Sequence, residues 1–351
     1  MTASVSFATS SLGWVLGTAP CAAEPCTSLL RTTDGGLEWV GIPAPAAQLA
    51  NPLSLHAHRS TVNAVMLANS RDGYVYGPGL WVTHDGGWAW QRISEVAGIS
   101  AFYVASMVTA GSSVYALVSN WDTGASGVGG RGGHTRLVRA PVGSEDFTVL
   151  DDFGPHSYLS QPLVASGSTV YVLEPAGLVR VQGTALTTQT LPPGCPGQLA
   201  ASSPTNLLFV CGEAAGQGSF GTREVYGSTN SGNTWTRLNN PGQGYGYDPD
   251  GVAAASEGHA VIGTVSGGGS GLLVTTDYAR TWAVRLGFND AATGFTDLAF
   301  QSASQAVVVH DPQYALEAQY GTSPGPIPVP SPATLWMSSD AAVSWHRVTF
   351  G

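Results

Sequence analysis

Residues 228–235, Ser-Thr-Asn-Ser-Gly-Asn-Thr-Trp, contain the pattern from which the fold of this chain follows. A hydroxyl residue comes first, an acid or its amide stands two positions on, a small residue two further, and a tryptophan three beyond that. The Asn side chain can accept backbone N–H bonds within a tight turn, and the glycine permits a positive φ that a Cβ would penalise. The segment therefore predicts a turn, closed by its own side chains, between two short strands.

The same pattern recurs along the chain. Further copies are residues 32–39, 83–90, 275–282 and 338–345, and each copy follows an apolar run and precedes a short strand pattern. Consecutive tryptophans of the five copies are 51, 145, 47 and 63 residues apart. A period of about 50 residues indicates a repeat architecture in which every copy is one structural unit.

The long gap between the second and third copies predicts two further units whose turns have lost the motif. It spans 145 residues, which is three periods. Strand patterns occur inside it at Ser113–Leu117 and Thr169–Leu173, followed by apolar segments at Arg136–Arg139 and Leu178–Val181. Five visible units and two hidden ones make seven, within the usual range of about four to eight blades for a β-propeller.

Each unit contains four strand patterns, which predicts an all-β chain of four-stranded antiparallel blades. In the first unit the patterns are Val5–Ala8, Gly13–Leu16, Ser28–Thr32 and Glu38–Ile42. We therefore expect residues 1–351 to form a single seven-bladed β-propeller. The blades are expected near residues 1–42, 62–93, 101–150, 162–191, 195–238, 251–286 and 294–350.

The repeated segment resembles the Asp-box, Ser/Thr-x-Asp-x-Gly-x-Thr-Trp, of BNR-type repeats in sialidase-like, sortilin-like and photosystem-assembly-factor propellers. The resemblance to the single-propeller assembly factors also covers Gly13–Leu16, a Gly-Trp-aliphatic strand followed by the box at Thr32–Trp39. Those relatives hold their partner with a patch of arginines, for which this acidic chain shows no counterpart. The resemblance implies a rigid disc that presents loops to another molecule, and it does not imply the particular partner.

An acid or amide that occurs once per repeat is explained by what every blade needs, so we interpret these residues as turn-forming. The alternative is a set of catalytic or calcium-binding acids. The residues concerned are Asp34, Asp85, Asn230, Asp277 and Asp340, with the motif tryptophans Trp39, Trp90, Trp235, Trp282 and Trp345. We expect each tryptophan to pack between neighbouring sheets.

Charge and composition argue against two classes of partner. Lysine is absent, and the 13 basic residues are arginines, against 23 Asp and Glu, which gives a formal net charge of −10. Such a chain has no basic stripe to neutralise phosphates and no attraction to an anionic membrane surface. We predict neither a nucleic-acid partner nor direct membrane insertion, and we expect a monomer that binds a protein or a carbohydrate.

The four cysteines lie as two close pairs, Cys21 with Cys26 and Cys195 with Cys211. Their spacing suits no zinc motif, so a local disulfide in each pair is the favoured interpretation, with four unpaired thiols in a cytosolic protein as the alternative. Disulfides imply a secreted or cell-envelope protein. Residues 1–10 are no signal peptide and no apolar run approaches the roughly 20 residues of a membrane span. We therefore expect the targeting or anchoring segment to lie outside this sequence.

The segments outside the predicted strands are longest on one face, between second and third strands and between consecutive blades. Propeller ligands usually bind at the channel mouth of the elaborated face, which makes that mouth the candidate site. The candidate residues there are His56, His58, Arg59, Asp151, Asp152, His156, Tyr158, Tyr245, Tyr247, Asp248, Asp250, Asn289 and Asp290. The mix of aromatic and acidic residues at 245–250 suits sugar stacking or a cation, and a solvated loop of turn-forming residues is the alternative.

The sequence predicts no metal site and no cofactor. Asp248-x-Asp250-Gly251 resembles the start of a calcium loop, but the third ligand and the distal glutamate are missing. His56-x-His58 has no third ligand next to it.

The sialidase resemblance covers the repeat but not the catalytic residues of that family. No Phe/Tyr-Arg-Ile-Pro motif is present, and seven arginines fall in predicted third or fourth strands, away from the propeller axis. Xyloglucanase-type relatives use two propellers facing across a cleft, and this chain has room for one. We therefore expect a non-catalytic, secreted or envelope-exposed scaffold that presents its loop face to a protein or glycan. The alternatives are a glycan-active hydrolase or lyase with acids at the channel mouth, and a lectin using Tyr245 and Tyr247.

Overall fold

The computed structural model describes twelve stretches of the chain, residues 2–19, 26–49, 61–120, 134–154, 163–174, 177–192, 197–211, 224–241, 248–266, 269–289, 294–311 and 333–350. These stretches consist of strands and turns, and none of them contains a helix able to cross a membrane. Seven four-stranded antiparallel sheets follow one another along the chain. The fold is a seven-bladed β-propeller, which confirms the fold class predicted from the repeat.

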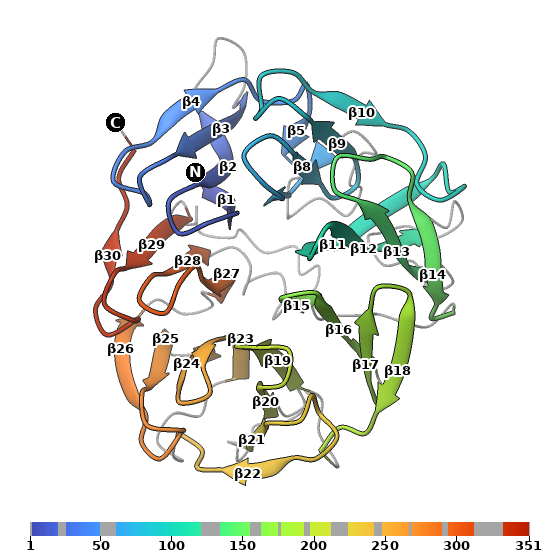
Figure 1. Cartoon of the computed structure of the whole chain (residues 1–351). Coiled ribbons are helices and arrows are strands. Elements are labelled where there is room, and N and C mark those ends of the chain that lie inside the picture. Colours follow the sequence, from blue (N-terminus) through green and yellow to red (C-terminus); the bar gives the residue numbers. More distant parts are fainter. Residues whose placement is uncertain are drawn as a thin grey trace, which may run out of the picture. The chain divides into compact units, whose positions relative to one another are not determined.

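The chain forms two compact units, and the first comprises residues 1–175 and 179–187 together with Gly351. It contains blades one to three and most of blade four (Figure 1). Its blade strands are β1 (Thr2–Phe7), β2 (Gly13–Ala19), β3 (Cys26–Thr32) and β4 (Val40–Ile42), then β7 (Ala64–Leu67), β8 (Gly73–Tyr76), β9 (Leu80–Thr83) and β10 (Gln91–Ile93), then β11 (Phe102–Ala110), β12 (Ser113–Asn120), β13 (Thr135–Pro141) and β14 (Thr148–Asp152), and then β15 (Val164–Ser166), β16 (Thr169–Glu174), β17 (Gly177–Gln182) and β18 (Ala185–Gln189).

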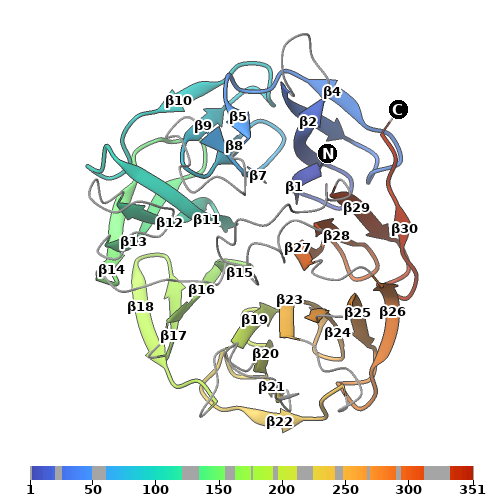
Figure 2. The same ribbon diagram turned by 180° about the vertical axis from the view of Figure 1, so that it is seen from behind.

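The second unit comprises residues 176–178 and 188–350 and contains blades five to seven. Its three sheets can be followed in yellow to red in Figure 2. Their strands are β19 (Gly197–Ala201), β20 (Leu207–Cys211), β21 (Val225–Ser228) and β22 (Thr236–Leu238), then β23 (Asp248–Ser256), β24 (His259–Ser266), β25 (Gly269–Thr275) and β26 (Ala283–Phe288), and then β27 (Gly294–Phe300), β28 (Ala306–Asp311), β29 (Thr334–Ser338) and β30 (His346–Arg347).

The hydrophobic core of each unit lies between consecutive sheets. In the first unit Trp14 and Leu16 of blade one pack with Val65 and Val75 of blade two, and similar clusters join blades two to three and three to four. In the second unit such clusters join blades five to six and six to seven. A sheet that is covered on both faces needs strands that are apolar on both faces. This explains near-continuous runs such as β12, in which Val114–Val118 are all buried.

The two blades without the motif form the same four-stranded sheets as the others. Blade three contains β11 to β14 in register, for example Tyr115 opposite Arg139, and blade four contains β15 to β18. Blades three and four therefore form without the repeated turn, and their interblade core is built mainly from the first three strands. The repeated turn is an addition to the blade and is not a requirement for it.

The five motif copies form one recurring turn between the third and fourth strands. In the seventh blade, the Ser338 hydroxyl donates to Asp340 Oδ1 at 2.8 Å and accepts the N–H of Ala342 at 2.9 Å. Asp340 also accepts the N–H of Ser344 at 2.8 Å. The same three bonds recur in the other copies. We call these five segments the repeated turns.

The tryptophan of each repeated turn is half-buried rather than fully buried. Within the first unit, the indole N–H of Trp90 donates to the carbonyl of Pro43, just beyond blade one. Within the second unit, Trp235 and Trp282 donate to Thr190 and Asn239, each just beyond the preceding blade. In blades two and six the tryptophan N–H therefore links its own blade to the residue that follows the preceding blade. Trp39 and Trp345 instead donate to carbonyls of their own turns.

Candidate functional site

The two ends of each blade differ in the length of their connections. Strands alternate in direction, so the second-to-third-strand connection and the connection to the next blade leave the sheet at the same end, which we call the loop end. These include the connection from Asp311 to Thr334 in blade seven and that from Asn120 to Thr135 in blade three. The opposite turn end has short turns between first and second strands, such as the one from Ala110 to Ser113. Long connections leaving rigid strands are where binding residues usually lie.

Asp152, one of the predicted site residues, organises the loop end of blade three. Its Oδ1 lies 2.9 Å from His134 Nδ1, and its Oδ2 accepts a hydrogen bond of 2.9 Å from Arg136 Nε. Arg136 Nη1 also donates to Asn120 Oδ1 at 3.0 Å. Burial alone would raise the pKa of Asp152, but bonds from the Gly154 N–H, His134 and Arg136 hold it below its ordinary value. Asp152 therefore remains ionised and ties together the strand ends from which two connections leave.

Asp151 and Glu174 form a second acidic group at the loop ends of blades three and four. Glu174 is the last residue of β16, and burial, together with the charge of Asp151, raises its pKa. Asp151 also accepts the N–H of Asp152 at 2.9 Å. The adjacent acids Asp151 and Asp152 therefore act on different partners. A carboxyl group with a raised pKa, such as Glu174, is what a general acid acting at a sugar requires.

Several predicted site residues lie outside the described residues, namely His56, His58, Arg59, His156, Tyr158, Tyr245, Tyr247 and Asp290. The connection that contains His56 to Arg59 begins and ends in a short parallel pairing of β5 (Gln48–Leu49) with β6 (Thr61–Val62). Asp248 and Asp250 were expected in a loop, but they belong to β23, where Asp248 pairs with Val265 of β24. The hairpin of β23 and β24 extends further than the sequence predicted, because the glycine-rich strand β25 continues the pairing.

The acids of the repeated turns are occupied by their own turns. Hydrogen bonds from the Glu38 N–H and the Thr32 hydroxyl lower the pKa of Asp34, and equivalent bonds lower those of Asp85 and Asp277. A catalytic acid needs a proton near neutral pH. These ionised carboxylates, pointing into their own turns, support the turn-forming interpretation.

The lowered pKa of Asp340 predicts that the protein becomes less stable at acidic pH. Bonds from the Ser344 hydroxyl and N–H lower its pKa from 3.8 to about 2. A carboxyl with a depressed folded-state pKa contributes stability that is present above its ordinary pKa and is lost as pH falls through the folded-state value. Thermal unfolding of wild type should therefore lose this contribution between about pH 4 and pH 2.

The matched variant is Asp340→Asn, because Asn230 already closes the corresponding turn of blade five as a neutral amide. We expect Asp340→Asn to fold and to show a shallower fall in Tm between pH 4 and pH 2 than wild type. Asp340→Ala removes the acceptor and should lower Tm even at pH 7. Equal acid dependence in wild type and Asp340→Asn would contradict the assigned role.

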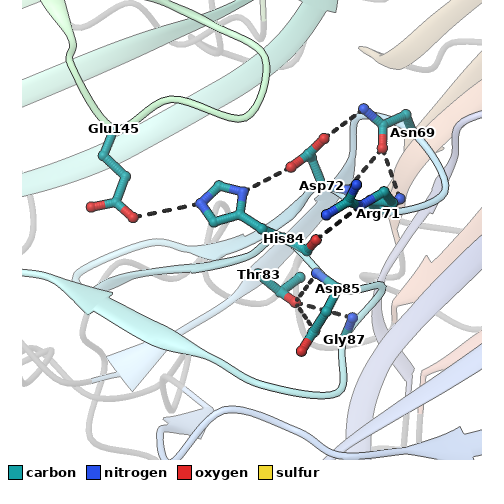
Figure 3. Close-up of polar contacts among 8 residues, drawn as sticks. All are labelled: Asn69, Arg71, Asp72, Thr83, His84, Asp85, Gly87 and Glu145. Carbon is teal, nitrogen blue, oxygen red and sulfur yellow. Dashed lines mark hydrogen bonds and ion pairs between the residues drawn. The ribbon is translucent and has the colours of Figure 1, made fainter.

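A further cluster of titratable side chains lies at the turn end, where no site was predicted. His84, Asp72 and Glu145 come from three turns of blades two and three and point toward one another (Figure 3). His84 follows Thr83 in its repeated turn, at a position that is Thr or Ser in the other four copies. That departure was the only signal in the sequence, and Asp72 and Glu145 could not be paired with it by spacing.

A tyrosine–glutamate pair occurs at blade five, and its chemistry argues against a sialidase-like nucleophile. The Tyr226 hydroxyl donates to Glu224, and Arg237 Nη2 lies 2.6 Å from Glu224 Oε1. The hydrogen bond to Glu224 is the main cause of a raised pKa for Tyr226. A phenol that loses its proton less readily is a weaker nucleophile at neutral pH. The three residues act as a surface ion-pair group on the third and fourth strands.

The described cysteines and acids bear on two further predictions. Neither Cys26 nor Cys211 is a free thiol, while their predicted partners Cys21 and Cys195 lie outside the described residues, so the pairing stays a prediction. Within the described stretches, no group of three or more His, Cys, Asp or Glu side chains is arranged to hold a metal ion.

Comparison with known proteins shows the fold. No protein-family model matches the chain, and no curated protein sequence matches it. Among solved structures, YCF48 bound to D1 peptide matches with a TM-score of 0.57 at 17% identity, over 88% of this chain and 90% of that one. YCF48 from Cyanidioschyzon merolae matches with a TM-score of 0.56 at 12% identity, over 88% and 92%.

An ancestral GH74 enzyme also matches, with a TM-score of 0.52 at 15% identity, over 97% of this chain but only 44% of that enzyme. Propellers of an assembly factor and of a glycoside hydrolase are therefore both structural neighbours. At these identities the likeness concerns the fold, and function has to be argued from the site.

Proposed function

We propose that this chain is a non-catalytic binding scaffold whose loop ends hold a protein ligand. The observation that supports this most strongly is the contrast between the two ends of the blades. At the turn end, each repeated turn is closed by bonds among its own side chains and backbone groups, as in blade seven. At the loop end, long connections leave strands whose ends are held by groups such as Asp152, His134 and Arg136. Long connections that leave rigid strands suit recognition of a partner.

The titratable groups of the described residues support binding over catalysis. The acids of the repeated turns are held ionised by their turns. Asp152 is paired with two cationic or cation-forming groups, and Tyr226 is paired with Glu224. A nucleophile that is hydrogen-bonded to an oriented base would be the sign of covalent catalysis, and none of these groups has that arrangement.

The comparison with YCF48 supports a peptide or protein ligand. That propeller was solved bound to D1 peptide, so a fold of this kind can bind a peptide. The ligand of this chain is expected to differ, since the chain has no lysine and a net charge of −10. Complementarity of charge favours a partner segment that is not strongly acidic.

We also propose that the repeated turns are Asp-boxes of the BNR type and that the protein is secreted or exposed on the cell envelope. The shared side-chain bonds of the five turns support the first proposal. The second is supported by the two close cysteine pairs of the sequence and by the absence of a free thiol at Cys26 and Cys211.

A glycan-active hydrolase is the second candidate, and one observation favours it. Glu174 has a raised pKa beside Asp151, which is how a general acid is distinguished from its neighbouring carboxylate in glycosidases. The GH74 neighbour acts as a fold precedent only, because this chain spans less than half of that enzyme.

The test is capture of a partner from an extracellular and envelope fraction of the source organism, using protein purified without reductant. We expect one protein to be retained in stoichiometric amount by wild type. The double variant Tyr245→Ala/Tyr247→Ala should retain it at least about tenfold less, the scale of a lost interface anchor. Leu37→Ala is the matched control, because Leu37 is 86% exposed and lies in the repeated turn of blade one, at the turn end. It should retain the partner as wild type does.

Three outcomes would contradict the proposals. Binding on a glycan array with no protein captured would favour the lectin. Release of reducing sugar from a polysaccharide panel, abolished by Glu174→Gln, would establish the hydrolase. Detection of four free thiols by mass spectrometry in the same preparation would contradict export.

A further inference from the structure

The contact between blades two and three at the turn end contains a histidine held between two carboxylates. His84 Nδ1 lies 2.7 Å from Asp72 Oδ1, and His84 Nε2 lies 3.5 Å from Glu145 Oε1 (Figure 3). Asp72 precedes β8, His84 follows β9, and both belong to blade two. Glu145 lies in the turn between β13 and β14 of blade three. All three residues belong to the first unit.

The two carboxylates are fixed in place by neutral donors. Asn69 Nδ2 donates to Asp72 Oδ2 at 2.8 Å, and Gln91 Nε2 donates to Glu145 Oε2 at 3.0 Å. A Cβ built on Gly143 would lie 3.4 Å from Asp72 Oδ1, so the turn of blade three fits closely against Asp72. His84 is the only side chain that forms an ion pair with either carboxylate within the described residues.

The other charged and phenolic groups around this cluster are held by contacts of their own. The Arg71 side chain donates to the His84 carbonyl at 3.2 Å and stays charged. Asp85 is bound by its own turn, which lowers its pKa. Burial, with the charges of Asp72 and Glu145, raises the pKa of Tyr74 to about 12, so this phenol stays neutral. Carboxylates are ordinarily ionised above about pH 5, and histidine ordinarily changes charge between about pH 5 and 8.

An imidazole has N–H on both nitrogens only when it is protonated. The protonated ring can donate to Asp72 and attract Glu145 at the same time. The neutral ring has one N–H, and the shorter contact to Asp72 retains it. The second nitrogen then presents a lone pair to the Glu145 carboxylate. Glu145 therefore loses its cationic partner when the ring is neutral, while Asp72 keeps a hydrogen bond.

From this geometry we propose that Asp72, His84 and Glu145 form a pH-sensitive latch between blades two and three. The latch is closed at mildly acidic pH, where the protonated imidazole joins both carboxylates. It opens as the pH rises through the histidine range, and the turn at residues 142–147 is then held less tightly. Side-chain exposures of 38% for His84, 16% for Asp72 and 33% for Glu145 allow the proton to exchange with solvent. The proposal does not depend on the proposed function.

Blade three is one of the two blades without the repeated turn. Its turn lacks the motif acid and the motif tryptophan. The bond from Gln91 and the contact from His84 are therefore contributed by the neighbouring blade. In blade six, by contrast, the repeated turn supplies its own tryptophan link to the blade before it. A side-chain latch from blade two takes the place of that link in blade three.

The experiment is a double-mutant cycle on the full chain at two pH values. Thermal unfolding is measured for wild type, His84→Gln, Glu145→Gln and the double variant at pH 5.5 and pH 8. At pH 5.5 we expect the Tm change of the double variant to differ from the sum of the two single changes by on the order of 1–2 °C. This is the scale of a partly exposed ion pair in a chain of this size. At pH 8 the non-additivity should vanish. Equal coupling at both pH values, or none at pH 5.5, would overturn the latch.

A second measurement uses the wild-type protein alone. Hydrogen exchange of the backbone amides at residues 142–147, corrected for the intrinsic effect of pH, should be several-fold slower at pH 5.5 than at pH 8. In Glu145→Gln this difference should be absent, while exchange in the turn between β11 and β12 is the same in both proteins. Protection that is independent of pH in wild type would refute the proposal even where the variants unfold.

Discussion

Replacement of Trp14 by alanine is expected to lower the free energy of unfolding by about 3–5 kcal/mol, the range measured for loss of a large buried aromatic side chain. Trp14 is 1% exposed and lies between blades one and two, with Trp90 at a ring-centroid distance of 5.9 Å. A Cβ built on Gly73 would come within 2.4 Å of the Trp14 ring. Backbone packed this closely cannot collapse into the space that the indole leaves. Denaturant unfolding at pH 7 measures the loss.

Trp14→Phe is the control variant, because it keeps an aromatic ring in the contact and removes the indole N–H. The indole N–H of Trp14 is buried and forms no hydrogen bond with the described residues, so its removal costs no bond and relieves a desolvated donor. We expect the phenylalanine variant to lose less than half of what the alanine variant loses. Equal losses of unfolding free energy in the two variants would mean that the phenylalanine ring restores no stability, and this would contradict the explanation by filled volume.

The Gly87→Ala substitution should destabilise the protein by about 2–4 kcal/mol, through a clash between blades added to backbone strain. Gly87 has φ +95°, and a Cβ there would lie 2.7 Å from Ile42 Cδ1 of blade one. The repeated turns of blades six and seven have alanine at this position, Ala279 and Ala342, with φ of 56° and 64°. The left-handed backbone by itself is therefore tolerated, and the Ile42 contact makes the difference.

Two further variants test that explanation by denaturant unfolding. Ile42→Val removes the atom that would clash, so the double variant Gly87→Ala/Ile42→Val should lose less stability than the sum of the two single variants. Gly98→Ala introduces a side chain at φ +81° with no atom within 4 Å of its Cβ, and it should cost about 1 kcal/mol from strain alone. If Gly87→Ala costs no more than Gly98→Ala, the interblade clash is not the cause.

The number and order of the blades could be predicted because each signal is local. The repeated turn bonds within eight residues, as at Ser228–Trp235, and a strand buried on both faces is apolar throughout, as at Val114–Val118. Both properties are visible in a short window of sequence. Blades three and four were recognised in this way although their turns lack the motif. The extended pairing of β23 with β24 was missed, because Pro249 and Gly251 have the composition of a loop.

The candidate site was predicted only in part. The sequence predicts a site at the loop end that includes Asp152, since acids near the end of a strand are exposed where connections begin, and this site stays a prediction. It did not indicate that His134 and Arg136 would share the Asp152 carboxylate, or that Glu174 would lie close enough to Asp151 to have a raised pKa. These contacts join the end of one strand to the start of another, and the register of two strands is needed to align them.

By itself the sequence determined the fold class and the seven blades, because both follow from patterns that are visible within one blade. Only the tertiary structure decided which side chains of different blades meet. Trp14 lies against Gly73 and Gly87, and His84 lies against Glu145, because neighbouring blades pack face to face. Such contacts depend on the distance and angle between two sheets, and no repeat or spacing within either blade specifies them.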